Sequence, residues 1–337
     1  MKSLRKEFTF IIVLVLVLAI AGIIFYVVKS KRILPSAATA GVTLTLSPSS
    51  GNQIVGSNFD VNIILNTNSQ ATVGSDVILT YNPSDLQVQD SDAVTTGVQI
   101  KAGALYYSYP VNSVDAINGK INFSGIIQPG GTNYSGSGTL ATITFRSLRV
   151  QSASAVNFMF TQNATNDSNV TSPSGSDLLY SVTNGSYNLI PPDITFNYSE
   201  TLQGRSNYSA SSATLKIFTL GTTTVVYTNS ALALNSTGSG QITISGLQTG
   251  SYDFQLKVPN YLSTKMTGVS LTNPLTLNFG LQKSGDLNND NIVNTVDFAT
   301  LSAKWAQSDA ISDINQDGIV NTVDFALLNA NWLIQGQ

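Results

Sequence analysis

DLNNDNIVNTVD at residues 286–297 and DINQDGIVNTVD at residues 313–324 are two copies of one twelve-residue pattern, 27 residues apart (313 − 286). Each copy places oxygen-bearing side chains at positions 1, 3, 5, 9 and 12 and leaves position 7 to offer its backbone carbonyl. A hard cation such as Ca²⁺ takes about six to eight oxygen ligands, and this spacing is that of an EF-hand loop. The repeat therefore predicts two calcium-binding loops rather than an Asn-rich and Asp-rich turn.

The predicted calcium ligands follow from these positions. They are Asp286, Asn288, Asp290, the carbonyl of Ile292, Asn294 and Asp297 in the first loop, and Asp313, Asn315, Asp317, the carbonyl of Ile319, Asn321 and Asp324 in the second. Position 6 must turn sharply, and it holds Gly318 in one loop and Asn291, which tolerates a positive φ, in the other. We expect two Ca²⁺ ions, one in each loop.

An amphipathic helix is expected to leave each loop. Phe298, Leu301 and Trp305 recur at i, i+3 and i+7, and Phe325, Leu328 and Trp332 repeat that spacing. No stretch of comparable length precedes either loop. Each loop should therefore have only an exiting helix, and the aromatic residues should help to build one shared core.

This duplicated loop and helix, with Asp at position 12, closely resembles a dockerin module over residues 284–337. The resemblance implies folding on two Ca²⁺ ions and docking onto cohesin modules. It also implies that positions 10 and 11 carry recognition, here Thr295 and Val296 in one copy and Thr322 and Val323 in the other. Identical pairs would allow docking in two orientations related by an internal pseudo-twofold axis. A simpler interpretation is that the two Thr side chains cap their helices, and the two roles are compatible.

Composition narrows the possible chemistry. The 337 residues contain no Cys and no His, which excludes disulfides, thiol catalysis, Ser-His triads and His-ligated zinc. Six of the 16 Lys and Arg flank one N-terminal segment, which leaves 10 against 18 Asp and Glu from residue 33 onward. Such an acidic surface argues against nucleic acid as a partner.

That N-terminal segment, residues 8–28, has 21 residues without a charge, enough to cross a hydrocarbon core of about 30 Å. A cleaved signal peptide is the alternative, but the basic residues at 29–32 stand where its cleavage region should be uncharged. We expect a cytoplasmic tail at 1–7, a transmembrane anchor at 8–28 and a linker at 29–40. Calcium loops suit a place where calcium is plentiful, so residues 33–337 are expected outside the cell.

Residues 41–190 show the apolar–polar alternation of strands, punctuated by Gly, Asn, Ser and Pro, and predict a β-sandwich. Four strings, GSNF at 56–59, YNP at 81–83, INFSG at 121–125 and GTLATITF at 138–145, resemble a cohesin, although that family commonly has Asp where Asn82 stands. Cohesins receive dockerin-bearing proteins, which are therefore the expected partners of this region.

Residues 191–283 again have a β pattern. The stretch GLQTGSYDFQLKVPNY at 246–261 resembles the closing hairpin of a carboxypeptidase-regulatory, transthyretin-like module, which implies a spacer. The expected fold class is mainly β with a small α C-terminal module: an N-terminal transmembrane helix, two β-sandwiches and the duplicated EF-hand-like dockerin.

An enzyme is not expected. Glycoside hydrolysis needs two carboxylates facing each other, and six of the 19 Asp and Glu are predicted calcium ligands. Asp85, Asp90 and Asp92 form the densest remaining group, which is typical of turn chemistry near an Asn-Pro pair.

Two non-catalytic functions compete. The first is a membrane-tethered, calcium-dependent adaptor that assembles extracellular proteins through cohesin–dockerin pairing in a cellulosome-like complex. The second is a cell-surface protein whose sandwich binds polysaccharide directly, for which the aromatic run YYSY at 106–109 is the relevant feature. Strand alternation places Tyr107 and Tyr109 on one face with Leu105, which predicts a core stripe and favours the adaptor.

Overall fold

The computed structural model describes residues 41–337. The expected tail, anchor and linker at 1–40 lie outside the described residues, so the anchor and its orientation stay predictions. Within 41–337, neither helix has the length and apolar character needed to cross a bilayer. The described part of the chain is mainly β, as predicted, with two short helices near its C-terminal end.

The first sandwich is built from two sheets. One has the order β12 (Leu179–Thr183), β1 (Val42–Ser47), β3 (Asn58–Asn66), β9 (Ser137–Ser147) and β5 (Leu86–Val88), with β6 (Lys101–Ala102) also on β9. The other has the order β2 (Ser50–Ile54), β13 (Gly185–Ile190), β10 (Gln151–Phe158), β4 (Gly74–Tyr81), β8 (Lys120–Ile126) and β7 (Ser108–Asp115), with β11 (Asn169–Thr171) on β4.

Alternation along these strands places one set of side chains between the sheets. In β3, Val61, Ile63 and Leu65 are fully buried, and β9 opposes them in an antiparallel register with Phe145 facing Phe59. Burial of such apolar side chains is worth about 25 cal/mol per Å² of area removed from water, so the period-2 pattern decides which face turns inward. The β pattern predicted for residues 41–190 is confirmed, since strands occupy most of this region.

The aromatic run at 106–109 differs from its prediction. Tyr106 is buried, Tyr109 packs on Phe123 at 5.2 Å between ring centroids, and Tyr107 is 69% exposed. The alternation prediction was wrong for Tyr107 because β7 begins only at Ser108, so the preceding residues lie in a bend with no two-residue period.

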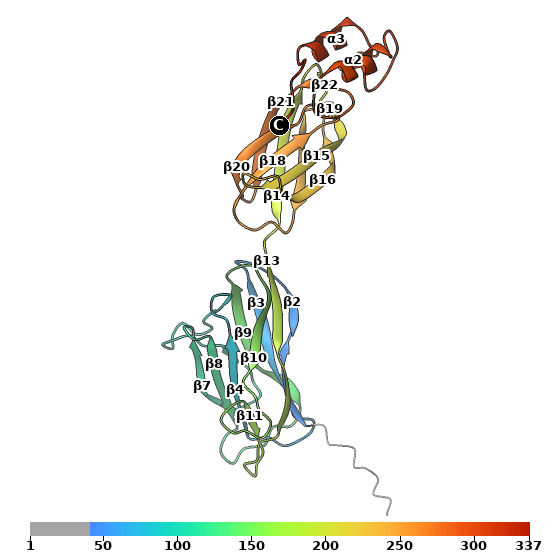
Figure 1. Ribbon diagram of the computed structural model, residues 1–337. Helices are drawn as coiled ribbons and strands as arrows, with labels where there is room; N and C mark the ends of the chain where they lie inside the picture. Colours follow the sequence, from blue (N-terminus) through green and yellow to red (C-terminus); the bar gives the residue numbers. More distant parts are fainter. Residues whose placement is uncertain (1–40) are drawn as a thin grey trace, which may run out of the picture.

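The middle sandwich begins after the two prolines at 191–192. Its sheets have the orders β17 (Ser239–Ile244), β14 (Ile194–Leu202), β21 (Leu275–Gln282) and β16 (Val225–Leu234), β15 (Ala210–Thr219), β18 (Ser251–Lys257), β20 (Thr264–Ser270). Phe196, Leu215 and Phe254 are fully buried between them. The two sandwiches lie end to end, joined where β13 leads into β14 (Figure 1).

The C-terminal module lies on the far end of the middle sandwich (Figure 1). It contains α2 (Thr295–Ser302) and α3 (Thr322–Asn329), and β22 (Ser284–Asp286) pairs with β19 (Asn260–Tyr261) of the middle sandwich. Its core consists of Leu287, Val293, Leu301, Ile314, Val320 and Leu328 together with Leu262 from the middle sandwich. A residue from the neighbouring sandwich thus completes the core of this small module.

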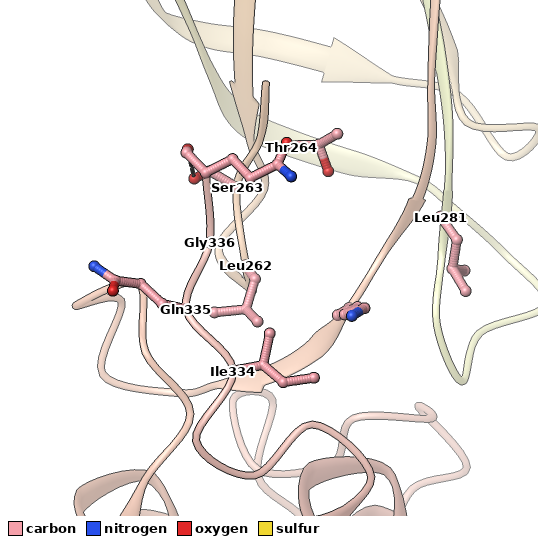
Figure 2. A pocket seen from close by; sticks show the side chains of 9 residues that line it. Leu262, Ser263, Thr264, Leu281, Ile334, Gln335 and Gly336 are labelled. Atoms are coloured by element: carbon pink, nitrogen blue, oxygen red, sulfur yellow. Dashed lines mark hydrogen bonds between the residues drawn. The ribbon is translucent and has the colours of Figure 1, made fainter. Parts of the chain in front are cut away.

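The junction is also polar. Gln203 Oε1 accepts hydrogen bonds from Asn331 Nδ2 at 2.6 Å and from Ser284 N at 3.1 Å. The junction also contains a pocket of about 190 Å³. Residues 334–336 and residues 262–264 line one side of this pocket, and Leu281 lies on the opposite side (Figure 2). The middle sandwich and the C-terminal module therefore share one interface rather than a free linker.

Candidate calcium and partner-binding site

The predicted loop-and-helix units are present, with differences at their ends. Each helix is eight residues long and ends before its Trp, so Trp305 and Trp332 lie in the turns that follow. Leu301 and Leu328 are buried as expected, while Trp305 is exposed. Trp332 is partly buried and packs against the core of the module, with its ring centroid 6.5 Å from that of Phe298. The expected contribution of the stripe to the core is therefore confirmed for the two Leu residues and Trp332, but not for Trp305.

An internal pseudo-twofold axis relates the two units. Phe298 and Phe325 occupy equivalent positions and contact each other with ring centroids 5.6 Å apart, as residues beside a twofold axis do. Backbone hydrogen bonds repeat in the same way, because Ala306 N donates to Val320 O and Leu333 N donates to Val293 O. The turn after each helix therefore donates a backbone hydrogen bond to the residue at position 8 of the other loop.

The position-12 carboxylates organise their loops. Asp297 and Asp324 are fully buried. Asp297 Oδ2 accepts from Asn294 N at 2.8 Å, and Asp324 Oδ2 accepts from Asn321 N at 2.9 Å, while their Oδ1 atoms accept from backbone N–H groups near the start of the loop. Each acid thereby ties both ends of its loop to the first turn of a helix, where negative charge is favourable.

The helix caps are not the predicted ones. Asn294 Oδ1 accepts from Val296 N at 2.7 Å, and Asn321 Oδ1 accepts from Val323 N at 2.7 Å, so the position-9 Asn side chains are the N-caps. The alternative role of Thr295 and Thr322 as caps is therefore wrong. Asn is as good a cap as Ser or Thr, and the capping box with Asp three residues later was visible in the sequence.

Position 1 differs between the loops. Asp313 Oδ1 accepts from Asp317 N at 3.1 Å, and its Oδ2 accepts from Gly318 N at 2.8 Å. Asp286 Oδ2 accepts from Asn291 N at 3.0 Å and from the Lys257 ammonium, whereas its Oδ1 is buried with no hydrogen-bond partner among residues 41–337. Burial raises the pKa of the Asp286 carboxyl, and the hydrogen bond from Lys257 opposes that shift.

The Asp at position 5 of each loop accepts hydrogen bonds from Asn side chains of the same loop. Asn288 Nδ2 donates to Asp290 Oδ2 at 2.7 Å in the first loop. In the second, Asn315 Nδ2 and Asn321 Nδ2 both donate to Asp317 Oδ2, at 2.9 and 3.2 Å, and the first of these bonds is the main reason that the pKa of Asp317 is lowered. Positive amide hydrogens thus lie against the position-5 carboxylate of each loop.

These residues fit calcium by their chemistry. The predicted side-chain ligands are all oxygen donors, which select hard cations, and a buried carboxylate oxygen without a donor, such as Asp286 Oδ1, is costly unless a cation satisfies it. Among the described residues, no three His, Cys, Asp or Glu side chains converge into a metal-binding group. A calcium ion would therefore depend on Asn and backbone oxygens as well as on the acids.

The predicted recognition residues lie on the surface. Val296 is 54% and Val323 48% exposed, and Thr295 and Thr322 beside them are exposed too. Each pair starts a helix, and the pseudo-twofold axis exchanges one pair for the other. Neither pair is covered by the middle sandwich.

Residues 284–333 match the Dockerin type I domain. The matched segment holds both loops and both helices, which confirms the predicted dockerin. No curated protein matches the sequence.

Solved structures similar to this chain are cohesin modules, the family that the first sandwich was expected to resemble. A type II cohesin domain from the cellulosome of Acetivibrio cellulolyticus is 20% identical, covering 45% of this chain and 96% of that one, with a TM-score of 0.36. The seventh ScaB type I cohesin from Pseudobacteroides cellulosolvens is 17% identical over 45% and 94%, with a TM-score of 0.35. The type II cohesin dyad from the adaptor ScaA scaffoldin of Acetivibrio cellulolyticus is 14% identical over 70% and 96%, with a TM-score of 0.36.

The three Asp residues that were considered for catalysis, at positions 85, 90 and 92, are engaged in structural contacts. Asp85 is buried and pairs with Arg149 Nε at 2.6 Å. Asp90 accepts from Gln99 N and Asp92 accepts from Val94 N, each at 3.0 Å. The contact of Asp92 with Val94 is the predicted turn chemistry, whereas Asp85 and Asp90 bind residues more distant in the sequence, which the prediction missed.

Proposed function

We propose that this chain is a non-catalytic adaptor of a cellulosome-like assembly, tethered to a membrane by residues 8–28. Its dockerin domain binds a cohesin module of another protein when the two loops hold calcium, and residues 41–190 receive a dockerin-bearing protein. Type I dockerin domains bind calcium, which supports the calcium dependence.

The observation that carries this proposal is the pair of exposed Thr-Val steps on twofold-related helices, within a segment that matches a dockerin domain. An exposed apolar residue at the start of a rigid helix is a surface that a partner can bury without reorganising the module. A pull-down with immobilised cohesin modules, in calcium and in chelator, tests this function. Binding that is absent in calcium, or equal in both, would contradict it.

Single changes of one recognition pair are expected to cost little. Val296→Asp or Val323→Asp should weaken cohesin binding only about twofold, because losing one of two equivalent orientations halves the association constant. The double variant should lose on the order of 100-fold or more, because both orientations would bury an unpaired charge. Isothermal titration against one cohesin module measures all three.

Aspartate in the first turn of a helix suits its dipole, so these variants should keep their fold. Val226→Asp, on the exposed edge strand β16, is the matched control and should bind like the wild type. A large loss from one single variant, with no further loss in the double, would show a single fixed orientation.

The ectodomain, residues 41–337, is expected to be monomeric with calcium at micromolar concentration and to bind partners in trans. The middle sandwich lies between the first sandwich and the dockerin domain, so one chain cannot readily join its own ends (Figure 1). Head-to-tail contacts between chains would give strings rather than closed dimers. Sedimentation should show one monomeric species. Calcium-dependent oligomers that vanish on removal of residues 284–337 would identify self-assembly instead.

Direct polysaccharide binding is the second candidate. It is favoured by Tyr107, whose ring is exposed on the first sandwich. However, a hollow of about 470 Å³ over β4, β8 and β7 is lined mainly by short polar side chains such as Asp76, Asn122 and Ser124, and its one lining aromatic residue, Phe123, is buried. Sugar-binding faces usually offer flat aromatic rings, so this hollow suits a protein surface better. Pull-down with a labelled dockerin against pull-down with insoluble cellulose or chitin separates the two functions.

The proposed membrane tether has its own test. Residues 8–28 are free of charges and long enough to span a bilayer. Alkaline extraction should leave the full-length chain in the membrane fraction, and protease added to intact cells should remove residues 33–337. Release of the whole chain by alkali would rule the anchor out.

A further inference from the structure

A lysine of the middle sandwich reaches into the first calcium loop. Lys257 ends strand β18, and its ammonium contacts Asp286 Oδ2 and the carbonyl oxygen of Tyr261. Its side chain is 19% exposed, and that of Asp286 is fully buried. The contact therefore lies inside the junction between the middle sandwich and the dockerin domain.

The second loop has no such cation. Both oxygens of its position-1 residue, Asp313, accept hydrogen bonds from backbone N–H groups of the same loop. Arg205 lies nearby, but it donates to the carbonyl of Ile314 at 3.4 Å and stacks over the Tyr261 ring. Among the ion pairs of residues 41–337, none joins a Lys or Arg to a predicted ligand of the second loop.

The two oxygens of Asp286 have separate roles. Oδ2 is taken by Lys257 and by the N–H of Asn291, while Oδ1 is buried and has no partner within the described residues. Lys257 thus contacts only Oδ2 and leaves Oδ1 without a partner within the described residues. It does place a positive charge on the same carboxylate, where two like charges repel more strongly than they would in bulk water.

We propose that Lys257 is the built-in counterion of the first loop. Without calcium it neutralises Asp286 and holds β22 against β19, which keeps the dockerin domain on the middle sandwich. Its charge also lowers the calcium affinity of the first loop, so the second loop fills first. This inference rests on the proposed calcium binding of both loops. By linkage, calcium in the first loop must weaken the Lys257–Asp286 pair to the same extent.

Calcium titration of the full-length chain tests the affinity difference. The chain has two Trp residues, Trp305 and Trp332, both in the dockerin domain, so fluorescence excited selectively at Trp reports on this domain alone. Calorimetry gives the number of sites. The wild type should show two unequal sites. Lys257→Met should tighten the weaker one by on the order of tenfold, and Lys257→Arg, which keeps the charge, should leave it near the wild-type value.

Lys216→Met is the matched control, because it removes one positive charge from an exposed position of neighbouring strand β15. It should change neither affinity. Unchanged affinities in Lys257→Met would overturn the counterion role. A weaker site in Lys257→Met would also overturn it, since Lys257 would then support calcium by orienting Asp286.

Hydrogen exchange in chelator supplies a readout independent of calcium. The amides of β19 and β22 should exchange faster in Lys257→Met than in the wild type, with β14 and β15 unchanged. Equal exchange would show that Lys257 does not hold the junction. If the wild type binds no calcium, the calcium part of the proposed function fails, and this exchange experiment still decides whether Lys257 fastens the two modules.

Discussion

Glu200→Gln is expected to make the middle sandwich more stable than the wild type above pH 8, by up to about 5 kcal/mol. Glu200 lies on β14 and is almost fully buried, and neither carboxyl oxygen has a hydrogen-bond partner within residues 41–337. Burial raises the pKa of this carboxyl from 4.5 to about 8. The neighbouring hydroxyls of Tyr198 and Tyr261 donate to backbone carbonyls instead, so they offer no compensation.

The direction follows from proton binding. Between pH 4.5 and about 8 the folded state keeps the Glu200 proton and the unfolded chain has released it. The contribution of Glu200 to the free energy of unfolding therefore falls by about 1.4 kcal/mol per pH unit across this window and is constant on either side of it. Glutamine carries no titratable proton, so the variant should lose this slope and match the wild type near pH 4.5.

Calorimetric or denaturant unfolding from pH 5 to 9, in saturating calcium, measures the effect. Asp193→Asn is the control, since it removes an exposed carboxylate from the same strand region and should leave the slope as it is. A slope in Glu200→Gln equal to that of the wild type would show that Glu200 is paired or hydrated in solution.

Calcium removal is expected to destabilise the dockerin domain by roughly 5 kcal/mol, because a site at about 100 times its Kd contributes about 2.7 kcal/mol and there are two sites. Each loop holds three Asp within twelve residues, and without a cation their repulsion opposes the fold. Chelator should therefore reduce the helical circular dichroism signal and change the fluorescence of the two Trp residues. A spectrum that chelator leaves unchanged would refute the metal assignment.

Variants at position 12 separate the two loops. Asp297→Ala and Asp324→Ala should each remove one of two calcium ions from the binding stoichiometry. Each also removes the carboxylate that closes a capping box, which costs about 1 kcal/mol even in chelator. Comparing each variant with the wild type in chelator isolates that cost. Retention of two ions by either variant would show that its Asp is not a ligand.

The dockerin domain could be predicted from the sequence because its determinants are local. Ligand positions in a calcium loop lie within twelve residues, and an apolar residue every three or four positions marks the helix that follows. Strands could also be predicted from local sequence. In β3, the apolar residues Val61, Ile63 and Leu65 alternate with mostly polar ones and so indicate which face is buried. Such spacing can be recognised without knowing which other elements pack against the segment.

The tertiary structure decided what depends on distant partners. Lys257 and Asp286 are 29 positions apart and meet only because β22 pairs with β19, so no spacing rule could join them. Glu200 looks like any strand residue until two sheets close over it and bury its carboxyl. Tyr107 is exposed because the chain bends just before β7. Burial and charge pairing are properties of the assembled fold, and they set the pKa values and contacts that a local pattern does not contain.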